Sequence, residues 1–248
     1  MMNSIDHRRA TLFIQCLVDG IYPEVGEAMA AVLQRLGVSL DCPTSQTCCG
    51  QPAFNSGYRD QALTAARRFI EIFEHAAVIV CPSGSCVSMV RHHYPMLFPV
   101  GDPWRGRAEA VARKTFEFTE YLVDVLGITD VGAVARGRVT YHDSCHLLRT
   151  LGVKDQPRQL LAAVKGISFV EMTGSDRCCG FGGAFSVKYG DISTAMVDEK
   201  IANIIATGAD IVTGCDMGCL MNIQGRLRRR GLPVEVRHIA QILNGEGV

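Results

Sequence analysis

The chain has 248 residues, 48% of them hydrophobic and 20% charged, which suffices for one large or two ordinary folded domains and excludes intrinsic disorder. Lysine plus arginine equals aspartate plus glutamate at 25 each, so the net charge gives no reason to expect nucleic acid or an anionic membrane as a partner. No apolar stretch approaches the ~20 residues of a membrane span, and we therefore expect a soluble, cytoplasmic protein.

The first half of the chain alternates short β-branched runs with longer runs of helical period. Strands are predicted over residues 11–17, 38–42 and 77–80. A helix is predicted from Pro23 to Gly37, because proline suits a first turn, an apolar stripe follows it and glycine suits a helix end. A helix over 67–73 follows the first Cys-Cys-Gly turn, and a long helix is expected from an N-cap at Asp102 to about Gly127.

The second half repeats this alternation of strands and helices. Strands are predicted over 139–142, 168–172, 210–213 and 234–236, and a helix is predicted over 194–205. Two further helices, over 87–93 in the first half and 220–229 in the second, are expected to open at Cys86 and Cys219. Strands that alternate with helices predict an α/β fold with mostly parallel sheets.

Eight of the eleven cysteines form two frames with nearly equal spacing. The first frame consists of Cys16, the adjacent pair Cys48-Cys49, and Cys86. The second frame consists of Cys145, the adjacent pair Cys178-Cys179, and Cys219. The repeat predicts two duplicated α/β cysteine-rich domains related by a pseudo-twofold axis. We place them at residues 1–126 and 138–248, with a linker at 127–137.

The repeated frames indicate that each half brings distant thiolates together. In a cytoplasmic protein such cysteines are metal ligands or redox groups rather than disulfides. Adjacent cysteines in an extended chain point in opposite directions, so both reach one centre only if the backbone turns sharply, which Gly50 and Gly180 permit. A polynuclear iron–sulfur cluster suits an adjacent pair better than one zinc ion, whose ligand pairs are usually separated by two to four residues.

Six segments carry a resemblance to a known family. They are 16–19, 46–58, Pro82-Ser83-Gly84-Ser85-Cys86, His142-Asp143-Ser144-Cys145-His146, Cys178-Cys179-Gly180-Phe181-Gly182-Gly183 and 218–223. The frame resembles the cysteine-rich CCG domain of heterodisulfide reductases and of glycolate oxidase iron–sulfur subunits. Over nearly all its length the chain is similar to the lactate utilisation protein A family.

This resemblance implies a cytoplasmic iron–sulfur, electron-transfer subunit of a complex that oxidises L-lactate to pyruvate. Such an oxidoreductase subunit would need two partner proteins of the same operon for activity, an iron–sulfur partner and a third subunit. The implied ligands are the eight cysteines of the two frames: Cys16, Cys48, Cys49, Cys86, Cys145, Cys178, Cys179 and Cys219.

The chain departs from the broader family, which closes each half with Cys-x-x-Cys. Ser83 and Asp216 stand three residues before the last cysteine of each frame, and Cys81 and Cys215 lie nearby but out of register, as less certain ligands. Four thiolates fit an ordinary [4Fe–4S] cluster, so we expect one cluster per half, or one between the halves. Zinc is the alternative occupant in aerobically prepared protein. Cys42 has no counterpart in the second half and is expected to be a core thiol.

Two further readings of the same cysteines stay open. A heterodisulfide or thiol reductase would use the cluster for chemistry on sulfur, and a zinc-stabilised scaffold would be non-enzymatic. His142 and His146 flank Cys145 and are either hydrogen-bonded histidines near a strand end or groups that tune the cluster and donate protons to it. No Gly-x-Gly-x-x-Gly follows a strand, so the sequence offers no support for hydride chemistry on this chain alone.

Overall fold

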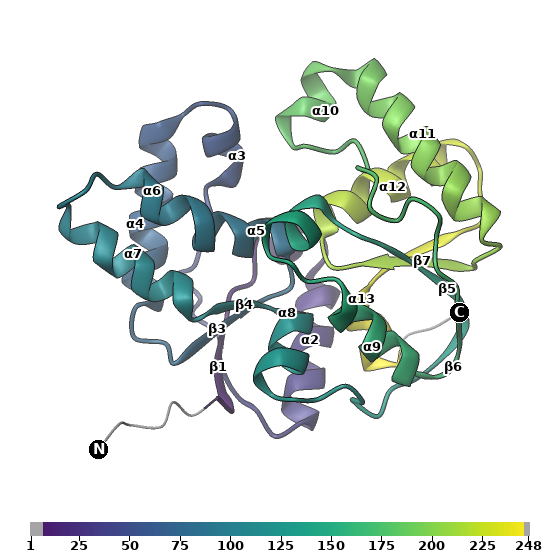
Figure 1. Ribbon diagram of the computed structural model, residues 1–248, viewed down its shortest axis with the longest axis horizontal. Coiled ribbons are helices and arrows are strands. Elements are labelled where there is room, and N and C mark those ends of the chain that lie inside the picture. The colour runs from purple at the N-terminus through teal and green to yellow at the C-terminus, as the bar shows by residue number, and fades with distance from the viewer. Residues whose placement is uncertain (1–6, 246–248) are drawn as a thin grey trace. The chain divides into compact units, whose positions relative to one another are not determined.

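The computed structural model describes residues 7–245 and divides into two compact units, Met1–Ile128 and Thr129–Val248 (Figure 1). Each unit has a four-stranded, fully parallel sheet with helices in the connections between its strands. The predicted α/β class with duplicated parallel-sheet domains is therefore confirmed.

Unit 1 has the strand order β2-β1-β3-β4. Its strands are β1 (Arg9–Leu12), β2 (Ser39–Asp41), β3 (Val78–Cys81) and β4 (Thr115–Glu117). Its helices are α1 (Cys16–Ile21), α2 (Pro23–Arg35), α3 (Gln51–Asn55), α4 (Arg59–Phe73), α5 (Gly84–Ser88), α6 (Tyr94–Leu97), α7 (Pro103–Arg113) and α8 (Phe118–Glu120). Two π-helical turns, η1 (Met89–His93) and η2 (Tyr121–Val125), continue α5 and α8.

Unit 2 has the equivalent strand order β6-β5-β7-β8. Its strands are β5 (Val134–His142), β6 (Lys165–Phe169), β7 (Ile211–Gly214) and β8 (Glu235–His238). Its helices are the π-helical η3 (His146–Thr150), α9 (Asp155–Ala163), α10 (Ala184–Lys188), α11 (Gly190–Ala206), α12 (Met217–Arg229) and α13 (Ile239–Asn244). Helices α11 and α12 pack side by side (Figure 1).

The duplication extends to the buried faces of the helices that follow the two Cys-Cys-Gly loops. Helices α4 and α11 bury five residues each, and every member of one set lies 131 positions from its counterpart in the other. The pairs are Ala62 and Ser193, Ala66 and Val197, Phe69 and Lys200, Ile70 and Ile201, and Phe73 and Ile204. The same helix face is therefore buried in both units, and at one of its five positions a lysine replaces a phenylalanine.

Several predicted elements are confirmed. Helix α2 begins at Pro23, buries Val25 and Met29 and ends just before Gly37, whose φ is 77°. Asp102 caps α7, because its side chain accepts from the Trp104 N–H at 2.9 Å. The predicted strands at 38–42, 77–80 and 210–213 correspond to β2, β3 and β7 to within one or two residues at each end.

The strand predicted over 11–17 is wrong in its second half, because β1 ends at Leu12. The Gln15 side chain accepts from the backbone N–H groups of Leu17 and Val18 and so starts helix α1 at Cys16. A side-chain cap of this kind satisfies N–H groups that the first turn of a helix leaves free.

The long helix predicted from Asp102 to Gly127 is also wrong, because α7 stops at Arg113. The chain then forms β4, which pairs with the exposed edge of β3. Tertiary pairing thus outweighs the local helical pattern.

The segment predicted as a linker, 127–137, overlaps β5, which begins at Val134 rather than at residue 139. A register shift between Val134 and Gly137 in the pairing with β6 interrupts the regular pattern that would have signalled these residues as strand.

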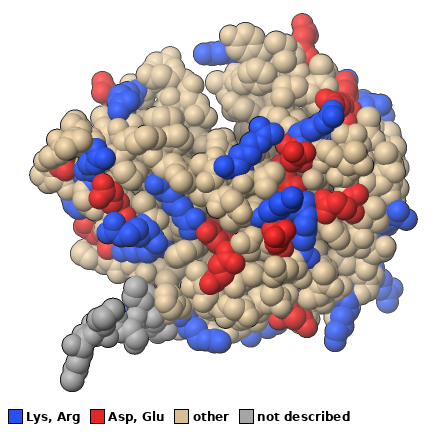
Figure 2. Space-filling model, viewed as in Figure 1, with Lys and Arg blue, Asp and Glu red and all other residues tan. Residues whose placement is uncertain are grey.

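Across the described residues, 7–245, no helix has the length and apolar character needed to cross a membrane. Lysine, arginine, aspartate and glutamate side chains are interspersed on the visible surface (Figure 2). This mixed surface agrees with the balanced composition and shows no single-sign field on that face.

Glu117 is a fully buried carboxyl group at the end of β4. Burial raises its pKa from 4.5 to about 7, although its oxygen accepts from the Thr119 N–H at 2.8 Å. The folded protein thus keeps a proton that the unfolded chain releases, and the resulting stability is present below pH 4.5 and lost as the pH rises through 7. The upper limit of this loss is about 3 kcal/mol.

We therefore predict that Glu117→Gln, which retains a capping oxygen but does not titrate, removes this pH dependence. Urea unfolding at several pH values from 4.5 to 8 should show wild type losing up to about 3 kcal/mol relative to the variant. The partly exposed Glu109, changed to glutamine, is the matched control and should follow wild type. Parallel stability curves for wild type and Glu117→Gln would contradict the prediction.

Candidate metal centres

Both cysteine frames gather beyond the carboxyl ends of three adjacent parallel strands. In unit 1, Cys16 follows β1, the pair Cys48-Cys49 lies between β2 and α3, and Cys86 follows β3. In unit 2, the equivalent residues follow β5, β6 and β7 in the same way. Because parallel strands end at a common edge of the sheet, cysteines far apart in sequence are placed together there.

The four cysteine sulfurs of unit 1 form close contacts. Cys16 Sγ lies 3.6 Å from Cys48 Sγ, and Cys49 Sγ lies 3.4 Å from Cys86 Sγ. The Gly50 N–H donates to Cys48 Sγ at 3.4 Å. Cys49 and Cys86 are buried, whereas Cys16 is exposed, so one side of this group faces solvent.

Unit 2 repeats this arrangement. Cys178 Sγ interacts with the sulfurs of Cys145 and Cys179, and Cys179 also interacts with Cys219. The Gly180 N–H donates to Cys178 Sγ at 3.4 Å, as Gly50 does in unit 1. All eight cysteines predicted as ligands are thus gathered into two groups of four. Their role as ligands stays a prediction.

The glycine after each cysteine pair permits the turn that both sulfurs need. Gly50 and Gly180 have φ values of 81° and 82°, a conformation that other residues rarely adopt. A Cβ on Gly180 would lie 2.6 Å from the Ser193 carbonyl oxygen, and one on Gly50 would lie 2.9 Å from Ala65 Cβ. Both the conformation and the close packing therefore require glycine.

A side chain from α6 in unit 1 and one from α12 in unit 2 hold the backbone of the second cysteine of each pair in place. The Tyr94 hydroxyl donates to the Cys49 carbonyl, and the Asn222 side-chain amide donates to the Cys179 carbonyl, each at 2.9 Å. Different side chains thus perform the same task in the two units, so this function of Tyr94 and Asn222 has no repeated sequence signature.

The thiols in each group oppose one another's ionisation. The hydrogen bond from Cys16 lowers the pKa of Cys48, and the same contact raises the pKa of Cys16. Cys145 and Cys178 form the same pair in unit 2. Four thiolates in contact become anionic together only when cations balance their charge, which is the condition that a metal centre satisfies.

Helices α5 and α12 place the last cysteine of each group at the same point, the third residue of the helix. The helices start earlier than predicted because Ser83 and Asp216 cap them. Ser83 Oγ accepts from the Cys86 N–H at 3.3 Å, and Asp216 Oδ1 accepts from the Gly218 N–H at 3.1 Å. The residues that replace the family's additional cysteine are therefore helix caps.

The three remaining cysteines occupy different environments. Cys81 ends β3, and Cys215 follows β7 with its Sγ 3.2 Å from the Tyr141 hydroxyl; both are fully buried. They occupy different positions in the two units and stay less certain ligands. The prediction of Cys42 as a core thiol is wrong, because it follows the edge strand β2 and is exposed. Its Sγ accepts from the Gln46 side-chain amide at 3.5 Å.

His142 and His146 differ sharply in surroundings. His146 is partly exposed at the start of η3, whereas His142 is buried, and burial lowers its pKa to about 3, so its ring is neutral. A ring nitrogen of His142 and the sulfurs of Cys179 and Cys219 all lie within 4.8 Å of one another. Neither ring nitrogen of His142 has a hydrogen-bond partner of good geometry, and the nearby Ser175 carbonyl accepts from the Asp143 N–H at 3.1 Å.

The sequence reasoning missed Lys200, which lies on the buried face of α11 near this group. Its ammonium donates to the carbonyls of Gly174 and Ser175 at 2.7 and 3.0 Å. Burial lowers the pKa of Lys200, while the negative charge of nearby groups, with Cys179 the largest, raises it. An overlay of α4 on α11 would have signalled it, because a lysine then falls on a phenylalanine of an apolar helix face.

Comparison with known proteins supports the duplication. A family model described as the CCG cysteine-rich domain matches the chain twice, over residues 10–91 and 139–224. Lactate utilization protein A of Geobacillus sp. (strain WCH70) is 51% identical over 236 residues, which cover 95% of this chain and 99% of that protein. Lactate utilization protein A of Anoxybacillus flavithermus is 53% identical over 94% of this chain and 98% of its own length.

The chain belongs to the lactate utilization protein A family.

Among solved structures, a hypothetical protein from Helicobacter pylori shares the fold of this family member. The two align with a TM-score of 0.60 at 11% identity, over 95% of this chain and 48% of that one. The chain thus spans about half the length of that protein, and the likeness concerns the fold alone.

The donor set of each unit fits a metal–thiolate centre. Each group offers four sulfurs, partly shielded from water, with a backbone N–H directed at one of them. Clustered cysteines of a CCG cysteine-rich domain suggest metal or iron–sulfur binding in both units.

We predict that Gly180→Ala disrupts the second centre more than Gly231→Ala, at the glycine that follows the end of α12. Both glycines have positive φ, so each variant should lose about 1–2 kcal/mol from backbone strain. A Cβ at Gly231 meets nothing within 4 Å, whereas one at Gly180 meets the Ser193 carbonyl. This clash should cost a further ~1–3 kcal/mol and lower the metal content of the purified protein. Urea unfolding and elemental analysis measure both effects, and equal losses would count against a packing role for Gly180.

Proposed function

We propose that this protein is an iron–sulfur electron-transfer subunit in the oxidation of L-lactate to pyruvate. The observation that carries the proposal is the repeated gathering of four cysteine sulfurs in each unit. The chain is about half identical, over nearly its whole length, to proteins named lactate utilization protein A. That name, together with a thiolate-rich site, supports a redox role in lactate metabolism.

Each unit would hold one [4Fe–4S] cluster, with Cys16, Cys48, Cys49 and Cys86 as ligands in unit 1 and the four equivalent cysteines in unit 2. A bound cluster supplies a one-electron carrier. The chain positions the thiolates, shields Cys49 and Cys179 from water and directs the Gly50 and Gly180 N–H groups at a sulfur of each set. Such N–H donors stabilise negative charge on the sulfur that accepts them.

Two other lactate utilisation proteins would complete the complex in the cytoplasm, an iron–sulfur partner and a third subunit. Oxidation of lactate to pyruvate releases two electrons and two protons, whereas an iron–sulfur centre carries one electron at a time. The step at lactate therefore belongs to a partner in this proposal, and this chain transfers the electrons onward.

One observation favours a second candidate, a zinc-stabilised scaffold. Zinc–sulfur bonds of ~2.3 Å in a tetrahedron place the sulfurs ~3.8 Å apart. The Cys49–Cys86 and Cys16–Cys48 sulfur separations of 3.4 and 3.6 Å in unit 1 are close to that value. Zinc therefore fits the resting positions of these thiols with smaller movements than a polynuclear cluster, and the metal content decides between the two.

We predict that protein purified anaerobically contains iron and acid-labile sulfide in equal amounts. Cys179→Ser should lose about half of both, because one of the two clusters then lacks a thiolate. Cys42→Ser is the matched control and should retain wild-type content, because Cys42 lies outside both groups. Zinc without sulfide in the anaerobic protein would refute the iron–sulfur proposal in favour of the scaffold.

A second prediction concerns the cell. Deletion of the gene should abolish growth on L-lactate as sole carbon source, and a plasmid copy carrying Cys49→Ser or Cys179→Ser should fail to restore it. Complementation with Cys42→Ser should restore growth, since that substitution leaves both groups intact. Undiminished growth of the deletion strain on lactate would exclude the role in lactate oxidation. It would not bear on iron–sulfur binding, which the metal analysis tests separately.

A further inference from the structure

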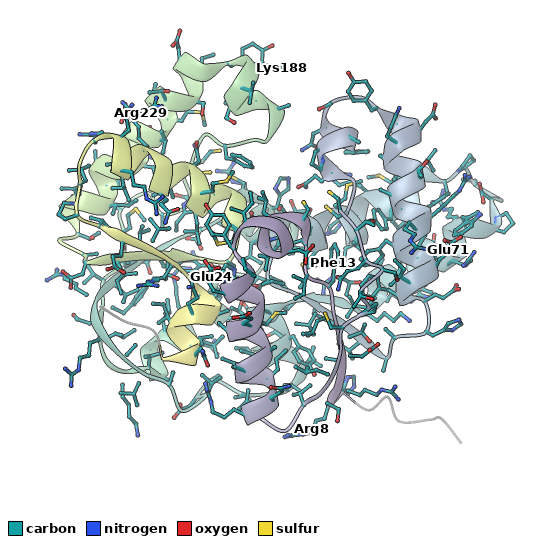
Figure 3. The ribbon with its side chains drawn as sticks, turned by 180° about the vertical axis from the view of Figure 1, so that it is seen from behind. Arg8, Phe13, Glu24, Glu71, Lys188 and Arg229 are labelled. Carbon is teal, nitrogen blue, oxygen red and sulfur yellow. The ribbon has the colours of Figure 1, made fainter. Side chains whose placement is uncertain are left out.

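The side chains near the cysteine group of unit 1 differ from those at the equivalent positions of unit 2. In unit 1, Phe13 lies three residues before Cys16, directly beyond β1 (Figure 3). In unit 2, His142 lies three residues before Cys145 at the end of β5. The buried faces of α4 and α11 pair Phe69 with Lys200. An aromatic pair in unit 1 therefore corresponds to a histidine and a lysine in unit 2.

The unit 1 pair is apolar. The rings of Phe13 and Phe69 meet edge to face with centroids 4.9 Å apart, and neither ring is more than 2% exposed. These side chains offer no charge and no N–H donor to the cysteine sulfurs of unit 1. Backbone N–H groups donate to sulfurs of this group, among them Gly50 to Cys48 and Leu17 to Cys16.

The unit 2 lysine is a buried ammonium. Lys200 is 1% exposed, and its recorded hydrogen bonds go to two neutral carbonyls rather than to a carboxylate. Within the described part of the chain, no carboxylate forms an ion pair with it. The carboxylate of Asp143 is already held by Arg158 at 2.8 and 3.0 Å. A buried charge requires a nearby opposite charge, and the groups whose negative charge favours the Lys200 ammonium are Cys179, which acts most strongly, then Asp143, Asp176 and Cys145.

The unit 2 histidine adds a donor. His142 is 1% exposed and its ring lies close to the sulfurs of Cys179 and Cys219. A neutral imidazole carries one N–H, and a thiolate that accepts it would satisfy an otherwise unpaired buried group. Unit 2 thus provides both a positive charge and an N–H donor where unit 1 provides two phenyl rings.

We propose that the unit 2 centre has the higher reduction potential of the two and holds the first electron that the protein accepts, because Lys200 and His142 stabilise its additional negative charge. A nearby cation and hydrogen bonds to cluster sulfurs both favour the reduced, more negative state. This inference rests on the proposed iron–sulfur function.

The test measures each centre separately in the full-length protein. Cys49→Ser leaves only the unit 2 centre intact and Cys179→Ser leaves only the unit 1 centre. Anaerobic titration with dithionite, followed by electron paramagnetic resonance, gives the midpoint potential of each. The centre in Cys49→Ser should have the higher potential. Lys200→Met and His142→Phe, each combined with Cys49→Ser, should lower it.

The matched control is Lys165→Met, which removes one positive charge from the same unit at the opposite end of its sheet. It should leave both potentials unchanged. Iron and sulfide content verifies that each variant has assembled its centre, and His142→Phe carries the test if Lys200→Met fails to fold.

Two results would overturn the inference. One is equal potentials for the two centres in protein that contains iron and sulfide, and the other is a lower potential in unit 2. Absence of iron and sulfide would overturn the proposed function and this inference together, and the metal analysis distinguishes that outcome from the first two.

Discussion

The parallel pairing of three neighbouring strands is the constraint on which both cysteine groups depend. Strands β2, β1 and β3 run in one direction, so the loops that leave them start from one edge of the sheet. Strands β6, β5 and β7 do the same in unit 2. A reversed strand would carry its cysteine to the other end of the sheet. The sheet therefore brings thiols from distant parts of the sequence together without joining any of them in a disulfide.

Much of this arrangement follows from local signals in the sequence. The repeated cysteine spacing predicts the grouping of all eight residues, and Gly50 and Gly180 predict the turn that each pair needs, because both are local chemical requirements. The early end of β1 at Leu12 and the strand β4 do not follow in this way. They depend on a side-chain cap by Gln15 and on the exposed edge of β3, which are effects of packing that a propensity pattern does not encode.

The surroundings of the cysteines are the least predictable part of the site. Tyr94 and Asn222 bind equivalent carbonyls with different chemistry, so no shared motif identifies them. Lys200 interrupts the apolar face of α11, so the helical pattern alone does not single it out. Its unusual position becomes evident only when α11 is compared with α4. The two units share the spacing of their cysteines, whereas the side chains around those cysteines differ between the units.

The caps at Ser83 and Asp216 have a consequence for how such sites change during evolution. In both units the residue that starts the helix stands where the broader family carries a further thiol. The residue at this position can therefore either cap the helix or bind the metal. A sulfur that is bound to metal cannot also satisfy the free N–H groups of a helix start. Gain of an additional ligand would remove a cap that contributes about 1 kcal/mol. The helix start would then be stable chiefly in the metal-loaded protein, and the number of thiolates would be coupled to how strongly folding depends on the cofactor.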